Sequence, residues 1–328
     1  MSQRDILILT ATPEPNVPFV AQFLPQGRFY QFNYDLFLEQ VMFTFSVLGE
    51  KVDWKIEDSD LTINMRDVRA VWFRRPQGIK ANDVIPEKFR AFVENEAERS
   101  LRSAWSVSQD SIFWMNNPEI EYATGYNKPL QTKIATASGL ATPETLITNN
   151  PDDARGFWER WQGEVIIKTF GGAPLRDGKD NCLSVHTSRV TRDMIEKFNS
   201  EIRHTPVMLQ NYIPKSLELR ITIVGDHVFP CAIHSQDSER TRDDWRRYDF
   251  ENVKHEIHQL SSDVSDKLRT FMKKIGLTFG AVDMVLTPRG EYVFLEVNPS
   301  GQWQWIEALT GMPISETIAK VLMNPPVP

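Results

Sequence analysis

The sequence predicts an α/β (α+β) protein folded as three lobes. Its 328 residues are too many for one small hydrophobic core and are typical of two or three lobes. In the first two thirds, short β-type apolar runs alternate with segments of helical periodicity. The last third is dominated by strand-like runs joined by short turns, one of them at Gly225-Asp226. These observations favour mixed sheets and helices over an all-α or all-β protein.

Residues 1–115 are predicted to form the first lobe. Its expected strands share a β-type apolar pattern and lie at residues 5–10, 41–48, 51–56, 61–65 and 70–73. The last of these ends abruptly in Arg74-Arg75-Pro76. Apolar residues recur at helical spacing from Pro86 to about Gln109, which predicts a helix with Pro86 in its first turn.

A central lobe is expected over residues 116–205 and a C-terminal lobe over residues 206–328. The central lobe should contain a helix from about Lys128 to Ser138, closed by Gly139, and a strand at residues 164–170. The C-terminal lobe should contain strands at 207–213, 219–224 and 227–234, an amphipathic helix over 262–275 and a final hairpin.

Composition and charge exclude several classes of function. Hydrophobic residues make up 41% and charged residues 25% of the chain, the balance of an ordinary globular protein. The net charge of −7 argues against nucleic-acid binding. No apolar run reaches the roughly 18 residues of a membrane span, and no signal peptide precedes the first strand, so we expect a cytoplasmic protein. The two cysteines, Cys182 and Cys231, have no metal-ligand spacing.

The final hairpin, GAVDMVLTPRGEYVFLEVNPSG, contains the strongest chemical signal. Side chains alternate along a strand, so Glu296 and Asn298 share one face. Folding the chain back at Thr287–Gly290 brings Asp283 opposite or nearly opposite Glu296. Two carboxylates and an amide then converge, and Mg²⁺ prefers such oxygen ligands together with phosphates. The alternative is a half-buried hairpin with a solvated polar face.

Three cations fit the same scheme. Lys168 ends a strand before Gly171-Gly172, and Lys128 begins a helix, although each alone could be a surface charge. Arg220 lies in the middle of an apolar strand, where an unpaired charge is costly. Its partner should be a phosphate or a protein carboxylate, and Glu218, two residues earlier on the same face, is the obvious protein candidate.

The order of these residues resembles the ATP-grasp superfamily over residues 115–325. The resemblance implies an ATP-grasp fold that holds ATP between two α+β lobes, with residues 1–115 as the preceding lobe. It implies that Lys128 and Lys168 bind ATP, that Gln210, Asn211 and Ile213 lie in the segment that meets adenine, that Glu218 binds the ribose and that Arg220 lies near the phosphates. Asp283, Glu296 and Asn298 match the metal ligands, and two Mg²⁺ ions are expected.

Within this superfamily, several phrases resemble the microviridin-type peptide maturases, or graspetide synthetases. They are AVWFRRP (70–76), TPETLITNNP (142–151), QNYIPKSLELRITIVG (210–225), DWRRYD (244–249) and FLEVNPSGQWQWIE (294–307). The resemblance implies phosphorylation of Asp or Glu side chains in a ribosomally made precursor peptide, followed by attack of a Thr or Ser hydroxyl or a Lys amine. A homodimer is also compatible with this resemblance. The loop after Lys168 (TFGGAPLRDGKDN) matches no family motif, so the resemblance does not predict whether this loop contacts the phosphates.

The segment DWRRYD supplies the candidate catalytic residues, together with Arg220. We expect Arg246 to hold the acyl phosphate or the carboxylate, because a guanidinium binds both through two hydrogen bonds. The alternative is a loop cation paired with Asp243 or Asp249. Asp244 is a candidate proton acceptor, although a carboxylate of ordinary pKa accepts a proton weakly.

Recognition of the peptide is less readable from sequence. Arg240, Arg242 and Arg247 would suit an acidic core peptide, and a leader segment could dock as a helix. Phe157, Trp158 and Trp161 are candidates for the wall of a docking groove, but such clusters are more often core. Two rival functions stay open: a ligase of the same superfamily acting on a free amino acid or small peptide, and a non-catalytic peptide-binding protein that keeps the fold.

Overall fold

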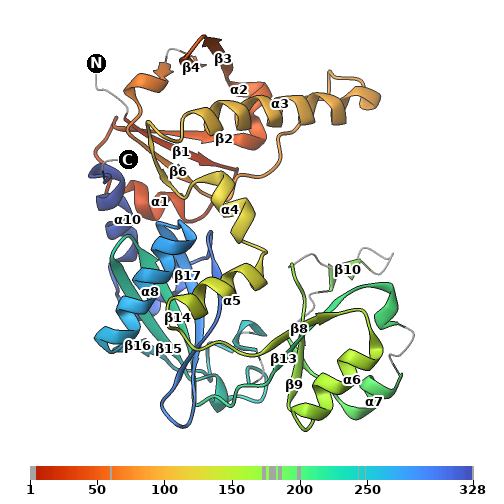
Figure 1. The fold of residues 1–328 in the computed structure, drawn as a ribbon. Coiled ribbons are helices and arrows are strands. Elements are labelled where there is room, and N and C mark those ends of the chain that lie inside the picture. The colour runs from red at the N-terminus through yellow and green to blue at the C-terminus, as the bar shows by residue number, and fades with distance from the viewer. Residues whose placement is uncertain are drawn as a thin grey trace.

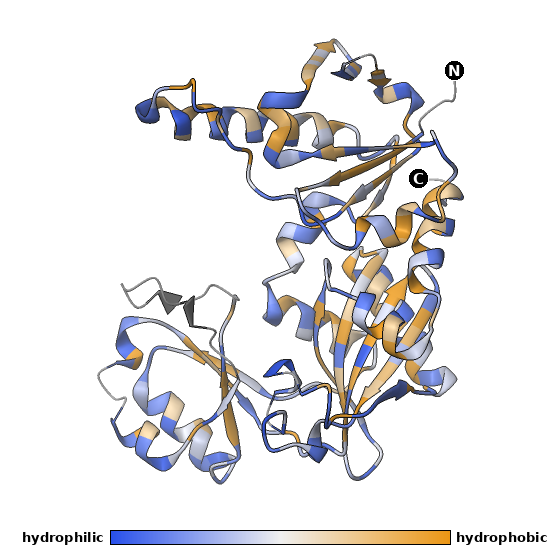
Figure 2. Cartoon of the chain, turned by 180° about the vertical axis from the view of Figure 1, so that it is seen from behind, coloured by the Kyte–Doolittle hydropathy of each residue, from blue (hydrophilic) through white to orange (hydrophobic). Residues whose placement is uncertain are grey.

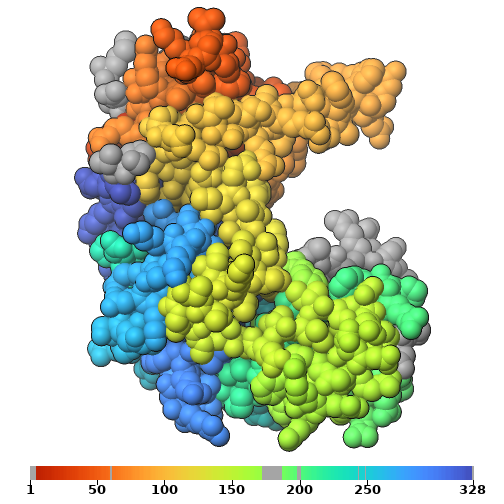
Figure 3. All heavy atoms as spheres, viewed as in Figure 1, coloured from red at the N-terminus to blue at the C-terminus, as the bar shows by residue number. Residues whose placement is uncertain are grey.

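The computed structural model describes residues 5–59, 61–171, 175–176, 182–183, 187–197, 201–242, 244–247 and 249–326. Three parts of the chain are distinct in space (Figure 1). The N-terminal part lies at the top of the view, the sheet formed by the last third of the chain lies below it, and the central part lies to the lower right. A wide recess separates the outer end of helix α3 from the central part in the space-filling view (Figure 3).

A parallel sheet organises the N-terminal part. Its strands have the order β2-β1-β6-β7 and are β1 (Ile6–Thr10), β2 (Phe29–Asn33), β6 (Ala70–Phe73) and β7 (Phe113–Met115). Strands β1 and β6 are buried throughout, as expected for a parallel sheet covered on both faces. The helices of this part are α1 (Val17–Ala21), α2 (Phe37–Gln40), α3 (Glu87–Val107) and α4 (Pro118–Thr124).

A small antiparallel sheet and the long helix α3 cover one face of the parallel sheet. The small sheet contains β3 (Met42–Leu48), β4 (Lys51–Asp58) and β5 (Leu61–Asn64). Trp54 from β4 and Trp105 from α3 are almost fully buried between the two layers, with ring centroids 5.1 Å apart. Hydrophobic and hydrophilic residues alternate along α3, whereas the strands of the parallel sheet are mostly hydrophobic (Figure 2).

The central part is an antiparallel sheet with two helices packed on it. Its strands have the order β12-β9-β13-β8 and are β8 (Thr145–Thr148), β9 (Val165–Lys168), β12 (Ser188–Arg189) and β13 (Val207–Asn211). The helices are α6 (Pro151–Arg160) and α7 (Arg192–Lys197), and a separate two-stranded ladder joins β10 (Leu175–Arg176) to β11 (Cys182–Leu183). Phe157 lies in the core of this part, with Trp158 and Trp161 packed against it.

The last third of the chain forms a five-stranded antiparallel sheet. Its order is β16-β15-β14-β17-β18, with β14 (Leu217–Val224), β15 (His227–Ile233), β16 (His255–Ile257), β17 (Phe279–Leu286) and β18 (Tyr292–Asn298). Helices α5 (Lys128–Ala137) and α8 (Ser262–Ile275) contribute buried residues to the core on one face of this sheet. Helices α9 (Gln304–Thr310) and α10 (Ile314–Met323) complete the chain.

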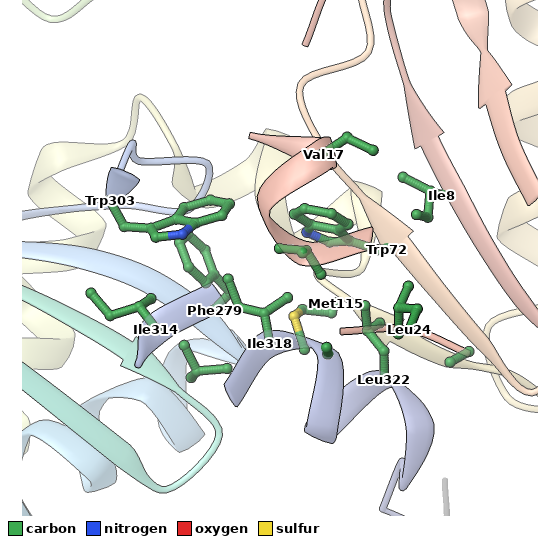
Figure 4. Close-up of a cluster of buried hydrophobic side chains, with 14 of the residues drawn as sticks. Ile8, Val17, Leu24, Trp72, Met115, Phe279, Trp303, Ile314, Ile318 and Leu322 are labelled. Atoms are coloured by element: carbon green, nitrogen blue, oxygen red, sulfur yellow. The ribbon is translucent and has the colours of Figure 1, made fainter. Parts of the chain in front are cut away.

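One hydrophobic core joins the N-terminal part to the last third of the chain. Ile8, Trp72 and Met115 from the parallel sheet pack with Phe279 and with residues of the C-terminal helices (Figure 4). The C-terminal members drawn there are Trp303, Ile314, Ile318 and Leu322. Because this core is continuous, the N-terminal lobe is bound firmly to the sheet that carries the final hairpin.

Most of the expected elements are confirmed, including the paired strands β3 and β4, helix α3 after Pro86, and helix α8, which ends at Gly276 with φ +79°. Two elements cross the expected lobe boundaries. Strand β13 pairs with β8 and β9 in the central sheet, although it follows residue 206. Helix α5 follows residue 116 but packs with α8 and β18. The boundaries at 115 and 205 themselves stay predictions.

Candidate active site

The final hairpin aligns its two carboxylates side by side. Asp283 on β17 is the register partner of Glu296 on β18, and Ala281 is the partner of Asn298. The ladder shifts by one residue between Asp283 and Met284. The expected turn between the strands ends with Gly290, whose φ of +81° favours glycine. The convergence predicted from the alternation of the strands is therefore confirmed for the two carboxylates.

Arg220 pairs with Asp283. The two residues are register partners on β14 and β17, and Nη1 of Arg220 donates to both oxygens of Asp283 at 3.0 Å. Glu218, the protein partner suggested by sequence, instead lies 2.9 Å from Nζ of Lys215. The suggestion was wrong because Glu218 already has a cation on the preceding loop, while the neighbouring strand presents a carboxylate directly beside Arg220.

Glu296 lies among three cations. Its Oε2 is 2.8 Å from Nζ of Lys128, and its Oε1 is 3.8 Å from Nη1 of Arg246. Burial raises the pKa of Glu296, but Lys128, Lys168 and Arg246 outweigh burial and lower the pKa to about 2. Glu296 is therefore ionised at neutral pH. Burial raises the pKa of the neighbouring Asp283, and Arg220 opposes that effect.

Two lysines bring the central part and the hairpin together. Nζ of Lys128, at the start of α5, also donates to the backbone oxygen of Thr169 at 3.2 Å. Burial lowers the pKa of Lys168, at the end of β9, although Glu296 opposes that shift. Lys128 and Lys168 lie far apart in sequence, yet both act electrostatically on one carboxylate, so they form part of the same site.

The loop around the short helix η5 (Trp245–Arg247) carries a second ion pair. Nε and Nη2 of Arg246 donate to the two oxygens of Asp244 at 2.8 and 2.7 Å. Burial raises the pKa of Asp244, but the hydrogen bonds and charge of Arg246 and a backbone N–H of Thr187 lower it below its ordinary value. A carboxylate held in this way is a weak proton acceptor. Asp249 bonds to Ser238 and Asn252, and Asp243 lies outside the described residues.

A cleft of about 650 Å³ of empty space, part of it open to solvent, lies between the central sheet and the five-stranded sheet. Its lining residues come from β9, the start of β12 and the residue before it, the linker after β13, the start of β14, the η5 loop and the final hairpin. They are Ile166, Lys168, Thr187, Ser188, Tyr212, Ile213, Lys215, Glu218, Asp244, Trp245, Arg246, Asp283, Val285, Leu295 and Glu296.

The residues expected to bind nucleotide divide into two groups. Lys168, Ile213 and Glu218 line the cleft, and Lys128 contacts Glu296 at its edge. The side chains of Gln210 and Asn211 are buried outside it. Gln210 donates to the Thr145 hydroxyl at 2.9 Å, and Asn211 accepts from the backbone N–H of Glu144 at 2.7 Å. These two side chains join β13 to β8, so any contact of this segment with adenine would be made by its backbone.

The carboxylates fit a hard cation such as Mg²⁺. Asp283 and Glu296 line the cleft on adjacent strands, and Glu296 is ionised. Mg²⁺ in phosphoryl-transfer sites is commonly held by one or two carboxylates plus substrate phosphates. Asn298 is exposed at the end of β18, and its Oδ1 accepts from the backbone N–H of Ser300 at 3.1 Å. In the described part of the chain, no group of three or more His, Cys, Asp or Glu side chains could hold a metal ion.

Lys215 is the main cleft residue that sequence analysis missed. Its side chain is only 5% exposed and pairs with Glu218. The motif YIPKSLE gave no signal, because lysine side chains are mostly exposed in proteins. Residues 172–174 and 177–181 of the loop after Lys168 lie outside the described residues, so its expected phosphate contacts are not addressed.

The candidate peptide-binding residues are scattered. Phe157, Trp158 and Trp161 belong to the core of the central part, and Trp158 donates to the backbone oxygen of Val190 at 2.9 Å. This favours the core alternative over a groove wall. Arg240 and Arg242 are exposed, and Arg247 is half-buried.

Comparisons with known proteins agree with this geometry. Residues 6–121 match the MvdD pre-ATP grasp domain, and residues 132–299 match the ATP-grasp domain of prokaryotic glutathione synthetase. The macrocyclase MdnC of Microcystis aeruginosa MRC, bound with its precursor peptide MdnA, is 31% identical, with a TM-score of 0.83 over 97% of this chain and 99% of that one. A RiPP-associated ATP-grasp ligase of Chryseobacterium gregarium, in complex with ADP and a leader and core peptide, is 26% identical, with a TM-score of 0.87 over 97% of this chain and 96% of that one.

A curated relative is more distant. A probable alpha-L-glutamate ligase of Histophilus somni is 22% identical over 62% of this chain, and the match spans 65% of the length of that relative.

A cleft between two α+β lobes, with paired carboxylates beside lysines and arginines, is typical of ATP-grasp enzymes. The chain belongs to the ATP-grasp ligase family, in the group that includes the macrocyclase MdnC. ATP-grasp ligases bind ATP or ADP with Mg²⁺. Among the described residues, no helix is long and apolar enough to cross a bilayer.

Proposed function

We propose that the protein is an ATP-dependent peptide macrocyclase. It phosphorylates Asp or Glu side-chain carboxylates of a ribosomally made precursor peptide and joins each to a Thr or Ser hydroxyl as an ester, or to a Lys amine as an amide. The observation that carries the proposal is the cleft itself, where Asp283 and Glu296 lie against Lys128, Arg220 and Arg246. The similarity to a peptide-bound macrocyclase over the whole chain, N-terminal lobe included, supports a peptide as substrate.

The proposed reaction has two steps. An oxygen of the substrate carboxylate attacks the γ-phosphorus of ATP, the bond to the β–γ bridging oxygen breaks, and ADP leaves. The hydroxyl or amine of the same peptide then attacks the acyl carbon, phosphate leaves, and the nucleophile's proton passes to solvent or phosphate. Each ring therefore removes the elements of one water from the peptide.

The residues of the cleft have separate roles in this scheme. Lys128 and Lys168 would bind the phosphates of ATP, with Gln210, Asn211 and Ile213 along the adenine and Glu218 at the ribose. Arg220 would hold Asp283 and stabilise the transferring phosphoryl group. Arg246, whose Nη1 faces Glu296, would bind the acyl phosphate. Asp244 suits holding Arg246 better than accepting a proton, because both of its oxygens are already engaged.

Bound Mg²⁺ would neutralise charge on the phosphates. Asp283, Glu296 and Asn298 are the residues that would hold it, and we expect two ions. A homodimer, an acidic core peptide with a separate leader segment, and a cytoplasmic location stay predictions that go with this proposal.

The test is mass spectrometry of a precursor peptide, encoded beside this gene, after incubation with the protein and Mg·ATP. Successive losses of one water mass that require ATP would establish cyclisation, and mild base would open esters but leave amides intact. An unchanged peptide mass, with ADP released only when free amino acids are supplied, would instead establish the small-molecule ligase. The similarity to a probable alpha-L-glutamate ligase supports this second function.

A further inference from the structure

Arg74 is a buried cation outside the cleft. It directly follows strand β6 of the N-terminal sheet, and its side chain is 1% exposed. Nη1 of Arg74 donates to the backbone oxygens of Ser300 at 2.9 Å and of Gly301 at 3.1 Å. The guanidinium carbon lies 4.6 Å from the ring centroid of Trp303. An arginine of one lobe thus holds the backbone of another, more than two hundred residues away in sequence.

The segment that Arg74 holds is the turn after the proposed metal-binding strand. Residues 298–301 (NPSG) begin with the last residue of β18, two residues after Glu296. The turn is closed by a hydrogen bond of 3.2 Å from the Gly301 N–H to the Asn298 oxygen. Two more hydrogen bonds fix the turn. Asn116 donates to the Pro299 backbone oxygen at 3.0 Å, and the Ser300 hydroxyl donates to Glu121.

The turn also packs directly on the ion pair of the site. A Cβ on Gly301 would lie 2.6 Å from Nη2 of Arg220 and 2.3 Å from the Cβ of Ala281. The backbone of the turn therefore fits against the guanidinium that pairs with Asp283. A shift of the turn would move Asn298 and disturb Arg220 together.

Packing alone does not account for an arginine at this position. A fully buried charge is costly unless ions and hydrogen bonds compensate it. Arg74 has one carboxylate partner, with Nε 3.2 Å from Oε1 of Glu14. Within the described residues its Nη2 is buried without a hydrogen-bond partner. Burial lowers the pKa of Arg74 to about 10, so it stays charged at neutral pH. An apolar side chain of similar length would fill the same space without that cost.

We propose that Arg74 is a positioning residue that fixes the 298–301 turn, so that Asn298 and Glu296 face the nucleotide site and Arg220 keeps its contact with Asp283. The N-terminal lobe thereby takes part in the proposed reaction without touching substrate. The inference rests on the proposed function for its Mg²⁺-dependent part, whereas the effect on the turn does not require any ligand.

The test compares Arg74→Met, which keeps length and removes the donors, with Arg74→Lys and with the control Leu322→Ala. Leu322 is buried in the same core, but its aliphatic side chain cannot hydrogen-bond the turn. Hydrogen exchange of the peptide that spans residues 297–303 is measured without nucleotide. The Mg²⁺ concentration for half-maximal ATP turnover is measured next, together with KM for ATP at saturating Mg²⁺.

We expect Arg74→Met to speed exchange in this peptide by about tenfold and to raise the Mg²⁺ requirement by about tenfold, the usual effect of losing a residue that orients a metal ligand. KM for ATP at saturating Mg²⁺ should stay within about twofold of the wild-type value. Arg74→Lys should give intermediate values, and Leu322→Ala should change neither the local exchange nor the Mg²⁺ requirement. Added guanidinium ion, well below denaturing concentrations, should partly restore an Arg74→Ala variant.

Wild-type exchange and a wild-type Mg²⁺ requirement in Arg74→Met would overturn the inference. It would also be overturned if Arg74→Met and Leu322→Ala changed both readouts by the same amount, since the role would then be general stability. Failure of the proposed function appears separately, as wild-type protein without Mg·ATP-dependent turnover. In that case the exchange measurement still decides whether Arg74 holds the turn.

Discussion

Arg220 and Asp283 face each other on adjacent antiparallel strands, with Nη1 of Arg220 3.0 Å from each carboxylate oxygen. Their side chains are 8% and 10% exposed, so the pair is nearly removed from water. Asp283 is the register partner of Glu296, and Glu296 in turn lies 2.8 Å from Lys128. From β14 through β17 and β18 to α5 the charges therefore run positive, negative, negative, positive, so each of the two adjacent carboxylates has a cation on its other side.

Removal of one member of the Arg220–Asp283 pair should destabilise the fold. Arg220→Met leaves a buried carboxylate without its cation and should lower the free energy of unfolding by about 3 kcal/mol. The double variant Arg220→Met/Asp283→Asn should lose clearly less than the sum of the two single losses, because the second change removes the stranded charge. Chemical denaturation of all four proteins measures this coupling.

Arg269→Met is the matched control for that cycle. Arg269 forms an ion pair of 2.8 Å with Asp266 on α8, but both side chains are exposed. An exposed pair contributes about 0–1 kcal/mol, so this variant should unfold nearly like the wild type. Additive losses in the Arg220–Asp283 cycle would show that the two residues contribute independently.

Glu296→Gln should remove almost all turnover while the protein stays folded. The substitution keeps the shape of the side chain and removes the charge that Lys128 and Arg246 face. Loss of one such preorganised charge should lower kcat by about 10²–10³-fold. ADP release gives the rate, and circular dichroism checks the fold. Glu291→Gln, an exposed change on the same hairpin, should keep full activity. Wild-type turnover in Glu296→Gln would remove Glu296 from the metal site.

The charge of Glu296 should make stability depend on pH in the acid range. Its pKa is lowered in the folded protein from 4.5 to about 2, so its charge stabilises the fold above about pH 4.5 and this contribution is lost as the pH falls towards 2. The full contribution is at most about 3 kcal/mol. The difference in unfolding free energy between wild type and Glu296→Gln should therefore be larger at pH 6 than at pH 3.5, as denaturant titrations at both pH values would measure. A difference that grows on acidification would contradict the assignment.

The hairpin could be predicted from sequence because residues close together in the chain determine its pairing. Side-chain alternation and the turn before Gly290 fix which residues of β17 and β18 face each other, and the structure has Asp283 beside Glu296 as expected. The mixed α/β class was predicted from the apolar runs and helical segments, and the ATP-grasp fold from the resemblance that the order of Lys128, Lys168 and these carboxylates supports. Gln210 and Asn211 could be placed on a strand, but not on the face that turns away from the cleft.

The errors and omissions concern contacts between segments far apart in the sequence. Glu218 was the nearest carboxylate to Arg220 along the chain, yet the pairing of β14 with β17 supplied Asp283 from 63 residues away. Strand β13 follows the expected boundary but completes the central sheet, since its neighbours are β8 and β9. Nothing in the phrase FRRP indicated that Arg74 is buried, because its partners, Ser300 and Gly301, lie in the last tenth of the chain.

The contact between Gly301 and Arg220 gives a further prediction. Gly301→Ala places a methyl group 2.3 Å from the Cβ of Ala281 and 2.6 Å from Nη2 of Arg220, distances at which the backbone must move. We expect a loss of about 1–3 kcal/mol in the free energy of unfolding, the usual cost of overpacking, and a fall in ATP turnover as Arg220 is displaced from Asp283.

Gly156→Ala is the control for that variant. Gly156 lies within α6, and an added Cβ there would meet no atom within 4 Å. Alanine favours the helix over glycine by up to about 1 kcal/mol, so this variant should be slightly more stable than the wild type and fully active. Denaturation midpoints and ADP release distinguish the two substitutions. Equal denaturation midpoints and equal rates of ADP release for Gly301→Ala and Gly156→Ala would contradict the prediction. The turn would then accommodate a methyl group, and its close packing against Arg220 would have no role in catalysis.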